Sequence, residues 1–377
     1  MKRIITLALF AMLLNISASA FYPAFDFRYG RVTYPQAVMD IEHDADHIYV
    51  AKLDGLVVID KATGEKTIYS SQLGTLNYTP SALALQGGEL WIGTLEGKLL
   101  NLKNGEFIVY DYGMDTNLSN IVFDPYGMMY VTSGRAGFLI NPWQKTVEQF
   151  ETYWWGFPGW TGHLCIDNDD MLWIANYGLQ GGMSLYGLAT YTPNDGTTYV
   201  FKENRDLRSG NVFAMDIDND GKIWYINGEY QLQKLEENEV QESYDLSDVC
   251  FDMLFDDKGD LWLAGSNGPL MMMKDGEFIN YPCDMDSKRW LCLDIDGDAI
   301  YIGTDEALLK FQDGSFTTLD ASITDQTSTP DLTGVDSPAV EPSAAGNQQW
   351  FDLQGRRITD KPRSGVYIQD GRKRIAR

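Results

Sequence analysis

The sequence of 377 residues is poor in the residue types that build metal and redox sites. It contains three histidines and four cysteines, and no two cysteines are spaced as Cys-x-x-Cys. Zinc sites need clusters of such ligands at short spacing, and the Gly-x-Ser-x-Gly elbow of serine hydrolases is also missing. We therefore expect neither a metal centre nor a cofactor.

Positive charge is scarce, because 29 Lys and Arg face 54 Asp and Glu, which gives a net charge of −25. Residues 1–20 carry two basic residues, and residues 347–377 carry eight basic against three acidic ones, so residues 21–346 hold about −32. Such a body repels phosphate backbones. This excludes nucleic acid, and it argues against anionic membranes or polyanionic glycans unless a local basic patch overrides the net field.

Only the N-terminus has a long apolar run. Met1-Lys-Arg3 is basic, Ile4 to Leu14 is apolar and Ser17 to Ala20 is small, which is the pattern of a secretory signal peptide cut after Ala20. No later stretch approaches the roughly 18 apolar residues of a spanning helix. We expect an exported protein without a membrane span, at the cell surface or extracellular, with the periplasm as the alternative.

Glycine and aromatic residues, by contrast, recur in a regular phrase. Leu83 to Phe107 contains three short apolar runs separated by glycine turns, as in consecutive antiparallel strands. The phrase repeats around seven aromatic anchors at intervals of 38 to 51 residues, the period of a four-stranded propeller blade. The anchors are Tyr49, Trp91, Tyr130, Trp173, Trp224, Trp262 and Tyr301.

The apolar runs explain why the blades should close into a ring. Leu90-Trp91-Ile92 and Leu261-Trp262-Leu263 are apolar on both faces of a strand, and such strands need neighbours on both sides. Radial stacking of the sheets supplies those neighbours. The sequence therefore predicts an all-β, seven-bladed β-propeller.

Residues 37–320 resemble the two-component regulator propeller repeat, whose phrase is an Asp-x-x-Gly turn followed by Leu-Trp-Ile-Gly-Thr. Asp256-Asp-Lys-Gly259 and Trp91-Ile-Gly-Thr94 carry this pattern. The resemblance implies the extracellular sensing half of membrane-spanning regulators. This chain departs from that arrangement because it has no spanning helix and no kinase.

Composition divides the chain further. Residues 21–320 form the expected propeller, and residues 321–346, rich in Ser, Thr and Pro, read as a flexible linker. Residues 21–36 fit either a closing strand on blade seven or an arm across the disc. Residues 347–377 predict two short strands, at 349–358 and 365–375, and resemble the end of type IX secretion sorting domains of Bacteroidota. That likeness implies the type IX machinery as a partner; a hairpin docked on the propeller is the alternative.

Two features have competing interpretations. Cys165, Cys250 and Cys292 fall on expected first strands and favour buried free thiols, the alternative being a disulfide from Cys283 to Cys292 or Cys250. Asp216 to Gly221 has the front half of a calcium loop but not its distal glutamate. Similar acids recur in other blades, so we favour turn chemistry, with aspartate accepting local backbone hydrogen bonds.

The most unusual loop is Tyr153 to Trp160, a Gly- and Pro-rich segment with five aromatic residues between blades three and four. It belongs to the connecting-loop face, defined by the loops that lead into each first strand and those joining second to third strands. Such rings suit a sugar or a peptide, although some of them could instead fill the gap between blades. The candidate ligand-binding residues on this face are Trp154, Trp155, Trp160, Arg135, Tyr177, Arg208, Glu229 and Trp290.

We therefore expect a propeller that binds a glycan or protein ligand without catalysis. The alternative is a secreted glycan-degrading enzyme of the polysaccharide lyase type, in which His163 would act as base beside Arg135 or Arg208. A second alternative is a protein-interaction scaffold.

Overall fold

The fold was analysed in a computed structural model of the chain. The structure describes residues 36–323, except for 72–73, 115–116, 134–135, 152–159, 178–186, 193–196, 201–210, 238, 248–249, 266–269 and 284–289. It also describes four short strands near the C-terminus. Residues 21–35, for which a closing strand or an arm was expected, lie outside this set.

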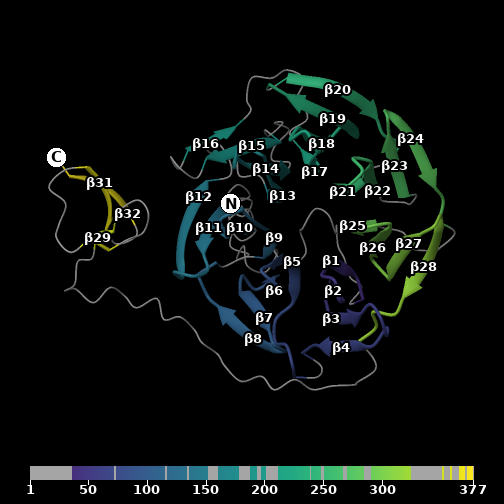
Figure 1. The fold of residues 1–377 in the computed structure, drawn as a ribbon, viewed down its shortest axis with the longest axis horizontal. Coiled ribbons are helices and arrows are strands. Elements are labelled where there is room, and N and C mark those ends of the chain that lie inside the picture. Colours follow the sequence, from purple (N-terminus) through teal and green to yellow (C-terminus); the bar gives the residue numbers. More distant parts are fainter. Residues whose placement is uncertain are drawn as a thin grey trace, which may run out of the picture.

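Seven four-stranded antiparallel sheets surround a common axis (Figure 1), which confirms the predicted seven-bladed β-propeller. Within the described residues the fold contains strands and no helix. Blades one to four comprise β1 (Val38–His43), β2 (His47–Lys52), β3 (Gly55–Asp60), β4 (Lys66–Tyr69); β5 (Pro80–Gln86), β6 (Glu89–Thr94), β7 (Leu99–Lys103), β8 (Glu106–Tyr110); β9 (Leu118–Phe123), β10 (Met129–Ser133), β11 (Ala136–Asn141), β12 (Thr146–Glu151); β13 (Trp160–Ile166), β14 (Leu172–Tyr177), β15 (Leu188–Thr192) and β16 (Thr197–Val200). Blades five to seven comprise β17 (Val212–Ile217), β18 (Ile223–Asn227), β19 (Gln231–Glu236), β20 (Glu239–Asp245); β21 (Cys250–Phe255), β22 (Leu261–Gly265), β23 (Leu270–Lys274), β24 (Glu277–Tyr281); β25 (Trp290–Asp296), β26 (Ala299–Thr304), β27 (Leu308–Gln312) and β28 (Ser315–Leu319).

All seven aromatic anchors lie on the second strand of a blade and pair with the equivalent residue of the first strand. Tyr49 pairs with Glu42, Trp224 with Asp216, and Tyr301 with Asp294. The register of every first strand then shifts near its start, in blade one between Val38 and Asp40. Such bulges increase the local twist, which helps each sheet to turn as it leaves the axis.

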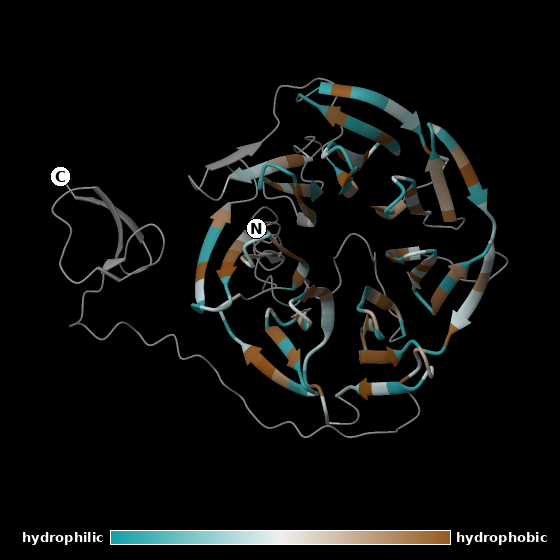
Figure 2. Cartoon of the chain, in the orientation of Figure 1, coloured by the Kyte–Doolittle hydropathy of each residue, from teal (hydrophilic) through white to brown (hydrophobic). Residues whose placement is uncertain are grey.

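The hydrophobic core is divided among the seven seams between neighbouring blades. Each seam has its own cluster of buried side chains, for example Val38, Ile48 and Tyr301 between blades one and seven. Hydrophobic segments recur in strands all around the ring (Figure 2). Each sheet thus buries both of its faces, as its continuous apolar strands require.

The Asp-x-x-Gly turns are held by their aspartates. Asp218 Oδ1 accepts hydrogen bonds from the backbone N–H groups of Asp220 and Lys222, and its Oδ2 accepts from Trp224 Nε1 at 2.9 Å. Asp167 and Asp256 bond their own turns and tryptophans in the same way. The turn interpretation of the acidic repeats is therefore confirmed.

All four cysteines are free thiols, as favoured from their positions. Cys250 and Cys292 are buried on first strands, and Cys165 and Cys283 are partly buried. Small side chains are needed there because the first strands converge on the axis. Burial raises the pKa of the Cys165 thiol well above its ordinary value, with a smaller contribution from Asp216, so this thiol stays protonated.

The C-terminal region forms its own four-stranded sheet in the order β30-β29-β31-β32. These strands are β29 (Trp350–Phe351), β30 (Arg357–Ile358), β31 (Gly365–Gln369) and β32 (Arg372–Ala376). Each of the two strands expected here is instead a pair. The second is divided into β31 and β32, which pair with each other from Gly365 with Ala376 to Gln369 with Arg372.

Candidate functional site

The structure places only some of the predicted ligand-binding residues. Trp154, Trp155, Arg135 and Arg208 lie outside the described residues. Trp160 begins β13 and pairs with Tyr177 at the end of β14, so the backbones of these two residues lie side by side within blade four. Glu229 is exposed in the turn between β18 and β19, and its N–H donates to Asn227 Oδ1 at 2.9 Å.

Trp290 requires a correction. It was expected on a ligand-facing loop, but it is the first residue of β25 and only 1% of its surface is exposed. Its ring packs edge-on against Phe316, with the centroids 5.7 Å apart. The strand begins earlier than the sequence indicated, and the tryptophan fills the seam between blades six and seven.

His163, the candidate base of the enzymatic alternative, is 7% exposed on the first strand of blade four. Its Nε2 lies 3.2 Å from the carbonyl oxygen of Phe251, and its Nδ1 lies 3.9 Å from Asp252 Oδ1. Both contacts reach blade six. The imidazole is therefore engaged in packing near the axis, and its proposed partners, Arg135 and Arg208, lie outside the described residues.

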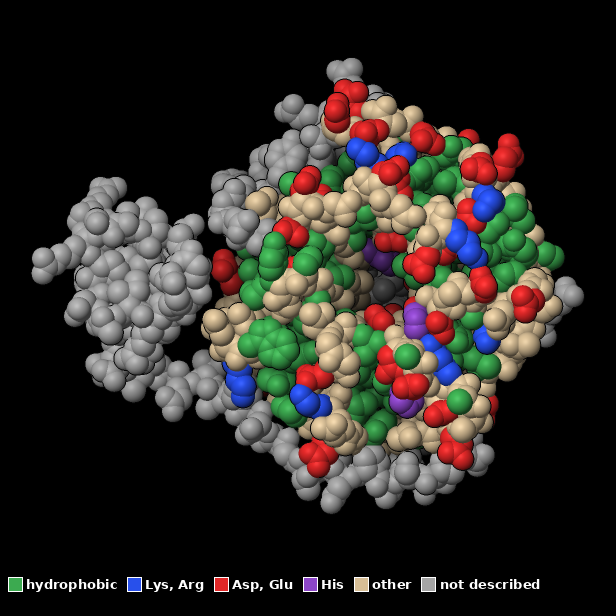
Figure 3. All heavy atoms as spheres, viewed as in Figure 1, with side chains coloured by type: hydrophobic (Ala, Val, Ile, Leu, Met, Phe, Trp, Pro, Cys, Tyr) green, Lys and Arg blue, Asp and Glu red, His purple; other side chains and the backbone are tan. Residues whose placement is uncertain are grey.

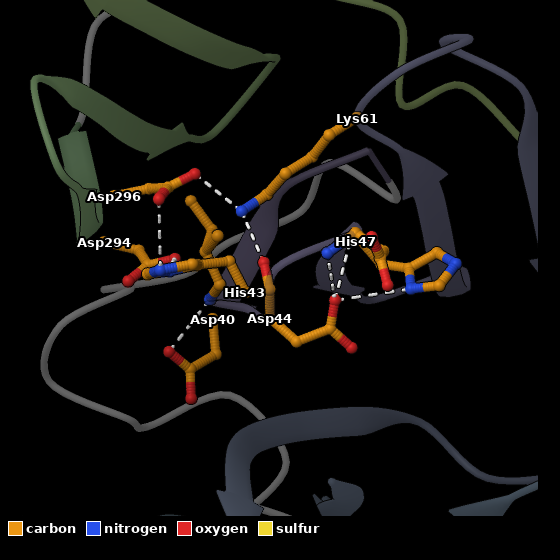
Figure 4. Close-up of polar contacts among 9 residues, drawn as sticks. Asp40, His43, Asp44, His47, Lys61, Asp294 and Asp296 are labelled. Carbon is orange, nitrogen blue, oxygen red and sulfur yellow. Dashed lines mark hydrogen bonds and ion pairs between the residues drawn. The ribbon is translucent and has the colours of Figure 1, made fainter.

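A connected group of charged side chains lies on the opposite side of the disc. We call this side the turn face, because it carries the turns that join first to second and third to fourth strands (Figure 3). His43 Nδ1 lies 2.7 Å from Asp294 Oδ2, and His43 Nε2 lies 3.6 Å from Asp296 Oδ1. Lys61 Nζ donates to Asp296 Oδ2 at 2.6 Å. These contacts join blade one to blade seven near the axis (Figure 4).

Proton affinities in this group follow from its geometry. The hydrogen bond to Asp294 raises the pKa of His43, against the effect of partial burial. Burial first, and then Asp294 and Asp40, raise the pKa of Glu42 well above its ordinary value. Burial acts on Asp296 in the same direction, but the hydrogen bond from Lys61 and the positive charges of Lys61, His43 and Lys310 together outweigh it and lower the pKa of Asp296. The group thus favours a protonated His43 and a neutral Glu42 between two carboxylates.

Asp44 connects this group to a pocket further from the axis. Its carbonyl oxygen accepts a hydrogen bond from Lys61 Nζ at 2.5 Å, and its Oδ1 accepts from the N–H of His47 at 2.7 Å. Its Oδ2 accepts from the Tyr49 hydroxyl at 2.6 Å. Asp44 therefore holds the first turn of blade one, with His47, in a defined position (Figure 4). Its bond to the hydroxyl also fixes Tyr49.

The pocket lies between blades one and two on the turn face and has a volume of about 600 Å³. Blade one contributes two tyrosines, a histidine and two acids, and blade two contributes Glu89, Lys103 and two turn glycines. The lining includes His47, Tyr49, Asp60, Glu65, Thr67, Tyr69, Gly87, Gly88, Glu89 and Lys103. Aromatic faces with a few fixed polar groups are typical of ligand sites.

Sequence reasoning missed this pocket because it directed attention to the opposite face. The one available signal was the turn of blade two, Gln86-Gly-Gly-Glu89, which replaces the Asp-x-x-Gly turn of other blades. Without that aspartate, the buried Trp91 Nε1 has no hydrogen-bond partner among the described residues. Over the same part of the chain, no three His, Cys, Asp or Glu residues are placed to hold a metal ion.

Comparison with known proteins shows the fold. No family model matches the chain, and no curated protein matches it significantly. Virginiamycin B lyase from Staphylococcus aureus is similar in structure, with a TM-score of 0.60 and 16% identity over 73% of this chain and 94% of that one. PorZ, a surface component of the type IX secretion system of Porphyromonas gingivalis, has a TM-score of 0.58 and 16% identity over 74% of this chain and 46% of that one. YCF48, in a structure with the D1 peptide, has a TM-score of 0.58 and 15% identity over 74% and 94%.

These neighbours differ in function, so the likeness establishes the seven-bladed architecture and not an activity. The described residues contain no helix that could cross a membrane.

Proposed function

We propose that the protein is an exported, non-enzymatic propeller that binds a peptide segment of a protein, or a glycan, on one face of the disc. The pocket of about 600 Å³ between blades one and two is the observation that carries this proposal. It is concave, is lined by aromatic and polar side chains, and lies on rigid strands and short turns. Binding sites commonly combine these properties.

The structural neighbours support a binding role for this architecture. YCF48 is described as bound to a peptide, and PorZ as a bacterial surface component of type IX secretion. In the same sense we propose that residues 1–20 are a signal peptide and that 21–320 are the propeller. The linker expected over 321–346 would begin after Ile323, because Ala321 and Ile323 are buried against blade one. The basic tail, 347–377, would then be recognised by type IX machinery at the cell envelope.

The connecting-loop face remains a proposed second surface. Trp154, Trp155 and Trp160 would supply stacking rings, with Arg135, Tyr177, Arg208 and Glu229 as polar neighbours. The two faces make different predictions, because a ligand on one face is insensitive to substitutions on the other.

A screen of neutral oligosaccharides and peptides against the purified full chain tests the proposal. Thr67→Trp fills the pocket from the outer strand of blade one, and Trp154→Ala with Trp160→Ala removes rings from the other face. We expect saturable binding that Thr67→Trp abolishes. Loss only in the tryptophan variants would assign the ligand to the connecting-loop face, and turnover of a glycan would favour the lyase alternative.

A further inference from the structure

The pocket exists because the seam between blades one and two is open at its turns. At two other seams a turn side chain lies against the next blade: a Cβ built on Gly221 would lie 2.5 Å from Asn168 Nδ2, and one on Gly259 would lie 3.2 Å from Asn219 Nδ2. In blade two, a Cβ on Gly88 would meet no described atom within 4 Å. The short glycine turn of blade two therefore leaves space at a place that an asparagine side chain occupies in those two seams.

Bonds between side chains span further seams on the same face. The Tyr126 hydroxyl donates to Asp170 at 3.1 Å between blades three and four, and Lys258 Nζ lies 2.6 Å from Asp298 between blades six and seven. These contacts close the gap between neighbouring turns. The two glycines at the tip of the blade-two turn bring no side chain to the seam with blade one.

The pocket has a net negative lining. Asp60, Glu65 and Glu89 line it, and Lys103 is the one lysine or arginine among its described lining residues. Lys103 pairs with Glu89 and is itself 52% exposed. Asp60 accepts hydrogen bonds from Thr63 and Ala62, which lower the pKa of its carboxyl, so it stays ionised. Among the described lining residues, Asp60 and Glu65 thus have no lysine or arginine partner, and only the imidazole of His47 acts on Asp60 with positive charge.

Two tyrosines, Tyr49 and the largely buried Tyr69, line the same pocket as these acids. Tyr49 is fixed by its hydrogen bond to Asp44, and its ring centroid lies 5.9 Å from that of His47. Tyr69 packs edge-on against Phe107 at 4.9 Å, so its ring is also held. A rigid aromatic wall beside carboxylates suits a cation, which gains both ion pairing and attraction to the ring faces.

We propose that this pocket takes an arginine or lysine side chain from a peptide segment of a partner protein. Arginine fits best, because its guanidinium is planar, weakly hydrated and able to bind a carboxylate while stacking on a ring. The inference rests on the proposed function and narrows it to one ligand class. The negative field of the body would also speed the encounter with a basic segment.

Titration calorimetry of the full chain with the peptide tri-arginine, and with triglycine and tri-glutamate as comparisons, tests the inference. We expect saturable binding of tri-arginine that weakens as salt rises. Neutralising the pocket with Glu65→Gln plus Glu89→Gln should weaken it roughly tenfold. The control Glu239→Gln plus Glu277→Gln removes equal charge from exposed positions on blades five and six, and should leave affinity within about twofold.

A second pair of variants tests the position of the binding site without changing the charge of the protein. Thr67→Trp should abolish tri-arginine binding, and Thr317→Trp, at the matching register position of blade seven, should not. Equal weakening by both charge pairs would show attraction to the overall field and overturn the inference. Tri-arginine could fail to bind while a neutral sugar or peptide binds the parent chain but not the Thr67→Trp variant. In that case the ligand class is wrong but the proposed function stands. If no ligand responds to Thr67→Trp, the pocket is not the binding site and the inference fails, and the proposed function then depends on the connecting-loop face. If no ligand binds at all, both fail.

Discussion

Blade one has two neighbours, and its two seams are built differently. Toward blade seven, His43 and Lys61 meet Asp294 and Asp296 at 2.7 and 2.6 Å. Toward blade two, Asp40 Oδ2 accepts a hydrogen bond from the N–H of Leu83 at 2.7 Å near the axis, and the turns beyond it leave the pocket. The same blade is thus closed by charge on one side and open on the other.

Ring closure explains the first seam. Blades one and seven are each formed by one continuous stretch of chain, so no strand is shared between them. The segment after blade seven adds to the closure, because Ala321 and Ile323 are buried against blade one and Lys52 Nζ donates to the carbonyl oxygen of Ala321 at 2.8 Å. The comparison teaches that charged pairs across the seam between blades one and seven stabilise the ring. Between the turns of blades one and two there is no such pair among the described residues, and this leaves room for a ligand.

The largest effect is expected from Asp40→Ala, which removes the polar bond that holds the open seam near the axis. It leaves the N–H of Leu83, a residue 4% exposed, without its acceptor, at a cost of about 2 kcal/mol in unfolding free energy. Urea denaturation measures this cost. Asp40→Asn keeps an acceptor and should lose less than half as much; equal stability of Asp40→Ala and the parent would contradict this role.

A smaller effect is expected at the closed seam from Lys61→Met. Lys61 is 17% exposed and its partner Asp296 is 36% exposed, so the ion pair is only partly screened and its loss should cost about 1 kcal/mol. The matched control is Lys258→Met, whose pair with Asp298 is 63% and 74% exposed. Thermal unfolding should show a smaller loss for the control, and the reverse order would undermine the assignment.

The closed seam should also weaken with rising pH. The pKa of His43 is higher in the folded chain than its ordinary value of 6.5, so its contribution is complete below that value and is lost as pH rises through the folded pKa. Glu42, whose pKa is also raised, acts in the same direction from a lower pH. Between about pH 6 and pH 9, His43→Gln should flatten the decline by up to about 1 kcal/mol. An unchanged slope in chemical denaturation would refute the His43 contribution.

The smallest effect on stability is expected from the pocket itself. Glu65→Gln plus Glu89→Gln alters one exposed and one partly buried acid, and should change the unfolding free energy by no more than about 0.5 kcal/mol. The same variant should lose affinity for tri-arginine. A stability loss as large as that of Lys61→Met would show that the pocket acids, like the seam charges, are structural.

Much of the fold was predictable, because it repeats. Seven aromatic anchors and the turn aspartates recur with the blade period, and local hydrogen bonds such as those of Asp218 involve residues close in sequence. The candidate site was not predictable, because the pocket is formed only where side chains of blade one meet the turns of blade two. The closed seam was not predictable either: His43 and Asp294 are 251 positions apart, and nothing in either local sequence indicates that they meet.

Trp290 illustrates the limit for a single residue. Its neighbours in sequence suggest a loop, yet in the propeller its side chain is buried between blades six and seven and packs against Phe316. The pocket illustrates the same limit for a surface. A turn of glycines leaves an open space only when no side chain of the adjacent blade occupies it.

By itself, the sequence determined the class of fold, because strand periodicity, apolar runs and turn chemistry are local and are repeated seven times. Only the tertiary structure decided which charges pair, which rings are buried and which seam stays open. The physical reason is that these outcomes depend on contacts between blades, and the order of blades around the axis brings together residues from opposite ends of the propeller.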